Sequence, residues 1–131
     1  MPETSYVLDC EALSRAALGN AEMKARLKDA HRTGIRVVTS SMTLIEAYHS
    51  KIGRPVWNWA MSGIVVEPVS RDVADEAIRL LGATGLHGHK YAIDAALAVI
   101  AGRQAGRVVV FTSDEDDMGK LCGADVLVRG V

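Results

Sequence analysis

The chain has 131 residues, of which 49% are hydrophobic, and its mean hydropathy is +0.12. This length and composition predict one domain, residues 1–131, with a core of ordinary size and no tract polar enough to be a long linker. Its 15 Lys and Arg residues against 16 Asp and Glu residues give a net charge of −1. That balance excludes a protein held to nucleic acid by a generally basic surface, so any phosphate partner must be bound locally.

The sequence carries no signal for export or membrane insertion. The first ten residues have acids rather than a basic region, and the longest apolar run, 95–101, is far shorter than the roughly 20 residues that span a bilayer. Cys10 and Cys122 share no metal-type spacing with histidines, so neither a disulfide framework nor a zinc site is indicated. We expect a soluble cytoplasmic protein, not bound to membranes, with two reduced and half-buried cysteines.

In the first half of the chain, short β-branched segments alternate with helical patterns. A strand is expected at 5–9, a helix at 21–34 between an Asn20 cap and a Gly34 stop, and a strand at 35–40. The next helix is expected at 41–50, with Thr43 and Glu46 in a capping-box relation. A further short helix is expected after Pro55.

The second half continues the alternation. The expected elements are a strand at 64–69, a helix that follows Ser70 and ends near Gly82 or Gly85, a helix at 89–106, a strand at 107–112, a helix at 115–123 and a strand at 125–129. Parallel strands need crossover connections, and helices fill them. The pattern therefore predicts an α/β fold of three α/β/α layers around a mainly parallel, roughly five-stranded sheet.

Acidic residues are placed where such a sheet binds ligands. Asp9 ends the first strand and Asp114 lies just past the fourth, so both fall at carboxyl ends of parallel strands. Glu46 and Asp94 interrupt apolar helical stretches, where acids are uncommon unless they are paired or bind metal. Four separate segments are thus expected to bring carboxylates to one edge of the sheet.

Each acid also has a purely structural interpretation. Asp9 could cap the first helix, and Glu46 could accept from the backbone N–H of Thr43 or face solvent. Asp94 lies near enough to a helix start to favour the helix dipole, and residues 114–117 could be an acidic helix N-terminus. Of the last run, we assign Glu115 and Asp116 to the solvated helix start.

Convergence of four carboxylates requires a counter-charge. Two carboxylates about 4 Å apart repel by roughly 4 kcal/mol at an effective dielectric constant near 20. A hard divalent cation would relieve this repulsion, and Mg²⁺ prefers oxygen ligands, takes one or two carboxylates directly and keeps several waters.

Four segments in this order resemble the PIN-domain ribonucleases, particularly the VapC-type toxins of bacterial toxin–antitoxin pairs. The segments are "YVLDCEAL", "SSMTLIEAYH", "HKYAIDAALAVIA" and "VVVFTSDEDDMGKL". The resemblance implies a parallel sheet sandwiched by helices and a site for Mg²⁺ or Mn²⁺ formed by Asp9, Glu46, Asp94 and Asp114, with Asp117 as a fifth acid. Many members have a hydroxyl residue after the first Asp, where this chain has Cys10 and Glu11.

The resemblance also implies an activity and partners. These are metal-dependent hydrolysis of RNA phosphodiester bonds, a homodimer, and a small antitoxin whose C-terminal segment enters the active site. Trp57 and Trp59 are plausible contacts for such partners, although a core role for one of them is equally consistent with the sequence. Candidates for local phosphate contacts, all of them also consistent with solvated surface, are His87, His89, Lys90, Arg15 and Arg103.

Two alternatives remain open from the sequence. A PIN-like protein that binds RNA without cleaving it would be expected to have lost an acid, and none of the four is lost. A phospho-acceptor signalling module would need an acceptor Asp after a middle strand and a Lys after a late one, which 64–69 and 125–131 do not supply. No Ser/His/Asp or Cys/His arrangement and no phosphate-binding glycine loop competes with metal-dependent hydrolysis.

Overall fold

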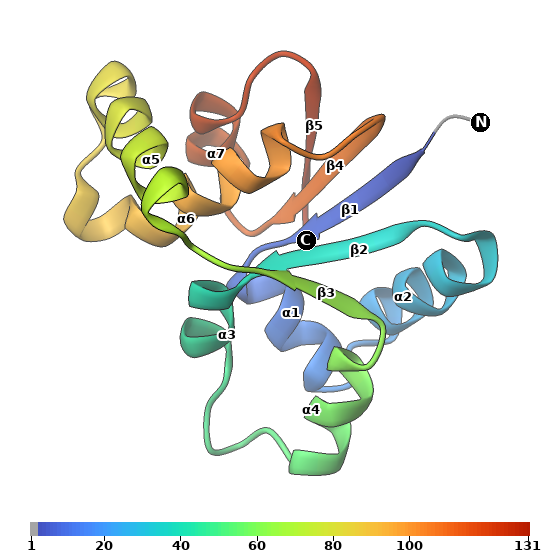
Figure 1. Ribbon diagram of the computed structural model, residues 1–131. Helices are drawn as coiled ribbons and strands as arrows, with labels where there is room; N and C mark the ends of the chain where they lie inside the picture. The colour runs from blue at the N-terminus through green and yellow to red at the C-terminus, as the bar shows by residue number, and fades with distance from the viewer. Residues whose placement is uncertain (1–2) are drawn as a thin grey trace.

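A computed structural model describes residues 3–131 (Figure 1). The elements in chain order are β1 (Thr4–Leu8), α1 (Cys10–Ala17), α2 (Ala21–Thr33), β2 (Arg36–Ser40), α3 (Ser41–Ala47), α4 (Arg54–Met61), β3 (Ile64–Glu67), α5 (Arg71–Thr84), α6 (Gly88–Gly102), β4 (Arg107–Thr112), α7 (Glu115–Leu121) and β5 (Val126–Gly130). None of these helices is long and apolar enough to cross a membrane.

The five strands form one sheet in the order β3-β2-β1-β4-β5, and every neighbouring pair is parallel. The chain starts at the central strand β1, moves outward through β2 to β3, and then passes back across β1 to β4 and β5. The strand order therefore reverses between β1 and β4, which is the kind of position where open α/β sheets bind ligands. This arrangement confirms the predicted parallel, five-stranded sheet.

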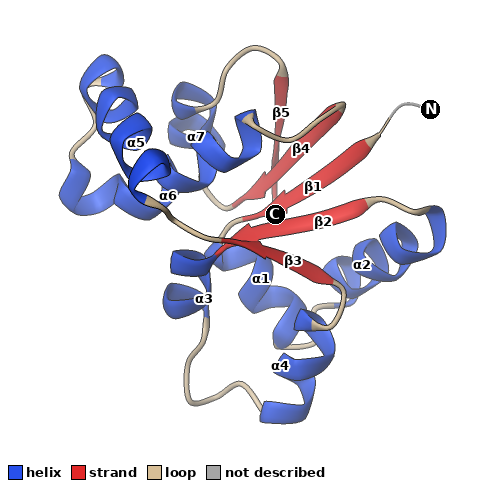
Figure 2. Cartoon of the chain, in the orientation of Figure 1, coloured by secondary structure: helices blue, strands red, loops and turns tan. Residues whose placement is uncertain are grey.

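Helices cover both faces of the sheet (Figure 2). Alternate strand residues point to opposite faces, as the pleat requires. Val7 and Val110 are buried against α5, α6 and α7. Leu8 and Phe111 are buried against α1 and α2 on the other side. The predicted three-layer α/β/α architecture is therefore confirmed.

Local signals fix most helix ends. The Asn20 side chain accepts from the Met23 N–H at 3.0 Å at the start of α2, where capping removes an unpaired donor. Helix α2 ends at Gly34, whose φ of 77° lies in the left-handed region that favours glycine. Gly85, with φ of 73°, ends α5 in the same way, so Gly85 rather than Gly82 is the stop.

Several predicted details are wrong. The capping box of Thr43 and Glu46 is absent, because Ser40 caps α3 and accepts from the Thr43 N–H at 3.0 Å. Helix α3 ends at Ala47 instead of residue 50. Strand β3 ends two residues early, at Glu67, because Pro68 has no N–H with which to continue a strand ladder. An additional helix, α1, fills the segment after Asp9.

Candidate active site

Asp9 is held at the strand-order reversal between β1 and β4. Its side chain is only 3% exposed. Oδ1 accepts from the Ala12 N–H at 2.8 Å, and Oδ2 accepts from the Ser113 N–H at 3.1 Å. Burial raises the pKa of Asp9, and the hydrogen bonds from Ala12, Thr112 and Ser113 partly oppose that rise. Asp9 is therefore the cap of α1 and also a fixed carboxylate beside the end of β4.

Hydroxyl groups position the helix that carries Glu46. Thr39, fully buried at the end of β2, donates through Oγ1 to the Leu8 carbonyl at 2.8 Å, which ties β2 to β1 one residue before the first acid. Ser14 of α1 donates to the Ala47 carbonyl at 2.8 Å, which ties the end of α3 to α1. The second bond holds the end of α3 against α1, and the first fixes the strand that leads directly into α3.

The pKa of Asp94, in α6, is affected by all four of the other acids that the sequence predicts as site residues. Its pKa is raised to about 6, first by burial and then by the negative charges of Asp9, Glu46, Asp114 and Asp117. Like charges disfavour ionisation only when they lie nearby. Asp94 therefore lies within electrostatic range of the other four predicted acids, and we call these five residues the acid cluster.

Cys10 lies within the acid cluster, immediately after its first acid. The pKa of the Cys10 thiol is raised, mainly by burial and then by the Glu46 carboxylate, with smaller effects from Asp9 and Asp94. The thiol is thus held in its protonated, weakly reactive form. Sequence reasoning placed Cys10 beside the site but did not anticipate its interaction with Glu46.

The last two acids are ordered by short-range contacts. The Asp114 carboxylate accepts from the Asp117 N–H at 3.2 Å and so caps α7. The Tyr91 hydroxyl donates to Asp117 Oδ2 at 2.6 Å, and this bond is the main cause of the lowered pKa of Asp117. Tyr91 was missed by the sequence analysis, although its position three residues before Asp94 places both on one face of α6.

The proposed phosphate contacts fall into two groups. Arg15 and Arg103 are already engaged in ion pairs, with Glu11 at 3.1 Å and Asp72 at 2.8 Å. The remaining candidates lie exposed at the start of α6: His87, His89 and Lys90. The pKa of Lys90 is raised, first by Tyr91 and then by the nearby acids, so its ammonium group lies at the rim of the acid cluster.

The donor set of the acid cluster suits a hydrated hard cation. Within residues 3–131, no three His, Cys, Asp or Glu side chains come close enough together to enclose a metal ion. Structural zinc sites need such a closed set of ligands. Mg²⁺ needs only one or two direct carboxylates and completes its shell with water and phosphate oxygens. Carboxylate oxygens are the type of ligand that Mg²⁺ and Mn²⁺ prefer, so the chemistry of this edge is compatible with a hydrated ion of that kind.

An all-parallel sheet between two helical layers, with acids gathered where the strand order reverses, defines a PIN-like fold. One solved structure with this fold is a chain of VapBC2 from Rickettsia felis, a complex that was solved bound to a DNA fragment from its own promoter. The two chains share 11% sequence identity and align with a TM-score of 0.68 over 97% of this chain and 98% of that chain. The sequence resemblance is thus confirmed at the level of the fold. No protein-family model and no curated protein matches the sequence.

Proposed function

We propose that this protein is a Mg²⁺- or Mn²⁺-dependent endoribonuclease, the toxin of a toxin–antitoxin pair. The observation that carries the proposal is the placement of Asp9 and Asp114 after β1 and β4, where the strand order reverses and the Ser113 N–H donates to Asp9. The pKa of Asp94, raised to about 6 by burial and by the charges of four further carboxylates, agrees with this placement. Such mutual repulsion is a stability cost with no structural benefit in the free protein, and acids of strongly perturbed pKa in a site are typical of function. The PIN-like fold supports the same class.

The five acids would contribute to metal binding in different ways. Asp9 provides a rigid, buried carboxylate, while Asp94, Glu46 and Asp114 supply the remaining negative charge. Asp117, fixed by Tyr91, adds a fifth acid from α7. When bound, the cation would polarise the scissile phosphate and activate water for in-line attack. No side-chain nucleophile is required, and Lys90 at the rim is placed to contact a neighbouring phosphate.

The partners follow from the same proposal. The substrate is RNA, and the inhibitor is a small antitoxin whose C-terminal segment covers the acid cluster. Similarity of fold to VapBC2, which was solved bound to promoter DNA, supports a paired antitoxin. We also propose that the toxin works in the cytoplasm as a homodimer.

Cleavage assays test the proposal directly. Purified protein is incubated with tRNA, rRNA and mRNA in Mg²⁺ or Mn²⁺, and cleavage should stop in EDTA and in Asp9→Asn and Asp94→Asn. Asp125→Asn, an exposed acid just before β5, is the matched control and should cut like the wild type. Equal cutting by wild type and both site variants would exclude the metal-nuclease mechanism. Tight RNA binding without cutting by any preparation would favour the non-cleaving alternative.

A further inference from the structure

The segment between α3 and β3 differs in charge from the rest of the chain. The protein has 16 acids, yet none falls between Glu46 and Glu67. The same stretch contains two cations, Lys51 and Arg54. It runs from the acid cluster along α4, which packs on α1 through buried alanines. A stretch of chain without acidic residues therefore leads from α3, which carries Glu46, to β3.

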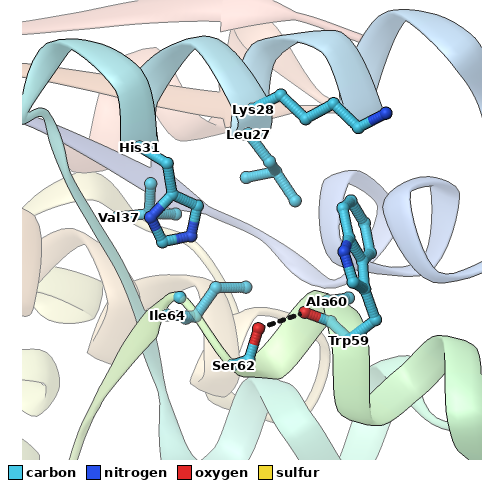
Figure 3. A pocket seen from close by; sticks show the side chains of 9 residues that line it. Leu27, Lys28, His31, Val37, Trp59, Ala60, Ser62 and Ile64 are labelled. Carbon is cyan, nitrogen blue, oxygen red and sulfur yellow. Dashed lines mark hydrogen bonds between the residues drawn. The ribbon is translucent and has the colours of Figure 1, made fainter.

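A cavity of about 260 Å³ lies between α2 and α4 (Figure 3). Its rim carries Trp59 from α4 and Lys28 and His31 from α2, and its floor is apolar, with Leu27 and Ile64 among the lining residues. The Trp59 indole is 40% exposed, an unusual amount for a large aromatic side chain in a monomer of this size. One wall of the cavity is thus an available aromatic face.

Trp59 also lines a second hollow of about 300 Å³, together with Pro55 and two lysines of α2, Lys24 and Lys28. The Lys24 ammonium lies 5.6 Å from the centroid of the indole ring. Among the described residues, neither lysine takes part in an ion pair. Two lysines that form no salt bridge among the described residues therefore lie beside the indole.

We propose that Trp59, Lys24, Lys28 and His31 form an accessory site for single-stranded RNA. A base would stack on the indole while the lysine ammonium groups contact adjacent phosphates, the combination by which proteins hold single strands without reading their sequence. The cavity is smaller than the roughly 300–1,000 Å³ typical of small-molecule sites, which favours one base of a polymer. The choice of RNA as the occupant rests on the proposed function.

Charge explains why a nuclease of this design would need such a site. The acid cluster repels the phosphates of RNA wherever a cation does not intervene, and the overall charge of −1 provides no compensating attraction. In addition to Lys90 at the rim of the acid cluster, the accessory site would hold phosphates independently of the metal. It adds affinity for the strand without adding charge to the catalytic edge.

The position of the accessory site sets a minimum length for RNA that contacts both places. The cavity touches Val37 and Ile64, which are paired at the beginning of β2 and β3, whereas the acid cluster lies at the carboxyl ends of the strands. A strand of five residues, such as β2, spans about 17 Å. At about 3.4 Å per stacked nucleotide, a stacked strand covers this distance with roughly five nucleotides, and an extended single strand needs fewer.

Binding of a 15-nucleotide single-stranded RNA in EDTA tests the accessory site without cleavage. Only two tryptophans are present, so Trp57→Phe leaves Trp59 as the sole indole signal. RNA should quench that fluorescence. Trp59→Ala should weaken binding about 10-fold, and Trp59→Phe should retain most of the affinity, because stacking needs only an aromatic face. A plot of log affinity against log salt concentration has a negative slope, and Lys24→Ala/Lys28→Ala should make that slope less steep by about 1.4.

The matched control is Arg71→Ala/Arg79→Ala, which removes the same charge from exposed positions of α5 on the other face of the sheet. It should bind RNA like the wild type, and circular dichroism should confirm that every variant is folded. Absence of quenching, or wild-type affinity and salt slope in the lysine variant, would overturn the assignment. A competition experiment would also overturn the assignment if a synthetic acidic, Phe-containing peptide of 15 residues displaced the bound RNA at a lower concentration than unlabelled RNA does. The site would then suit a protein segment better than RNA.

The outcomes separate this inference from the proposed nuclease activity. Quenching and salt-dependent binding without any cleavage in Mg²⁺ would refute the nuclease and leave the RNA site in place. Cleavage that depends on Asp94, with no contribution of Trp59 to binding, would support the nuclease and refute the accessory RNA site.

Discussion

Replacing Asp94 with Asn should make the metal-free protein more stable while removing its activity. The asparagine keeps the size of the side chain but removes the charge that burial and four neighbouring carboxylates disfavour. A residue that served only the fold would show the opposite behaviour, because its loss would destabilise the protein.

The size of the effect follows from the pKa of Asp94. The pKa is raised from 3.8 to about 6, and each unit of difference corresponds to ~1.4 kcal/mol. Asp94 is partly open to solvent, which screens the repulsion, so we expect a gain of about 1–3 kcal/mol in the free energy of unfolding at pH 7. For a chain of this length, each kcal/mol corresponds to a rise in Tm of roughly 3–5 °C.

The pH dependence has a defined sign. Between about pH 4 and pH 6 the folded protein retains a proton on Asp94 that the unfolded chain has released. The wild type therefore loses stability relative to Asp94→Asn as the pH rises through this window. Below about pH 4 Asp94 is protonated in both states, so the difference between the two proteins should vanish.

Urea unfolding in EDTA at pH 3.5, 5 and 7 measures these differences, with Asp125→Asn as the exposed control. Mg²⁺ at 100 times its Kd should then stabilise the wild type by ~2.7 kcal/mol and Asp94→Asn by much less, reversing their order. If Asp94→Asn were less stable than the wild type in EDTA at pH 7, the repulsion within the acid cluster would be refuted.

Three further expectations concern other parts of the site. Thr39→Val should lower the free energy of unfolding by about 1–3 kcal/mol in urea titrations, because the buried Leu8 carbonyl loses its side-chain donor; an unchanged value would contradict the role of this bond. Cys10, whose raised pKa keeps it protonated, should react with a disulfide reagent at pH 8 more slowly than a small free thiol, and Glu46→Gln should accelerate that reaction; equal rates would argue against their interaction. In cleavage assays Trp59→Ala should raise KM about 10-fold for a 15-nucleotide RNA but not for a dinucleotide, which is too short to reach both sites.

The acids show how far sequence reasoning can reach toward a site. Asp9 and Asp114 could be assigned to the same sheet edge because carboxyl ends of parallel strands share an edge, whatever the strand order. Glu46 and Asp94 could be selected because an acid within an apolar helical stripe needs an explanation. The alternatives for Asp9 could not be separated from the sequence, and the structure shows why: the carboxylate both caps α1 and bonds the end of β4.

Hydrogen bonds between segments distant in the chain could not be predicted from the sequence. The bond from Ser113 to Asp9 joins residues 104 positions apart, and the one from Tyr91 to Asp117 joins residues 26 apart. Neither is implied by local spacing. The cavity beside Trp59 likewise needs α2 and α4, which are separate in sequence, to lie side by side.

The sequence by itself determined the alternation of strands and helices, the helix ends at Asn20 and Gly34, and the identity of the acids, because these depend on local periodicity, capping and backbone freedom. Only the tertiary structure decided that Asp94 lies within electrostatic range of four other acids, that Cys10 interacts with Glu46, and that α4, which has no acid, forms a cavity with α2. Those features depend on strand order and helix packing, which are set by burial of the whole core and are not encoded at any single position.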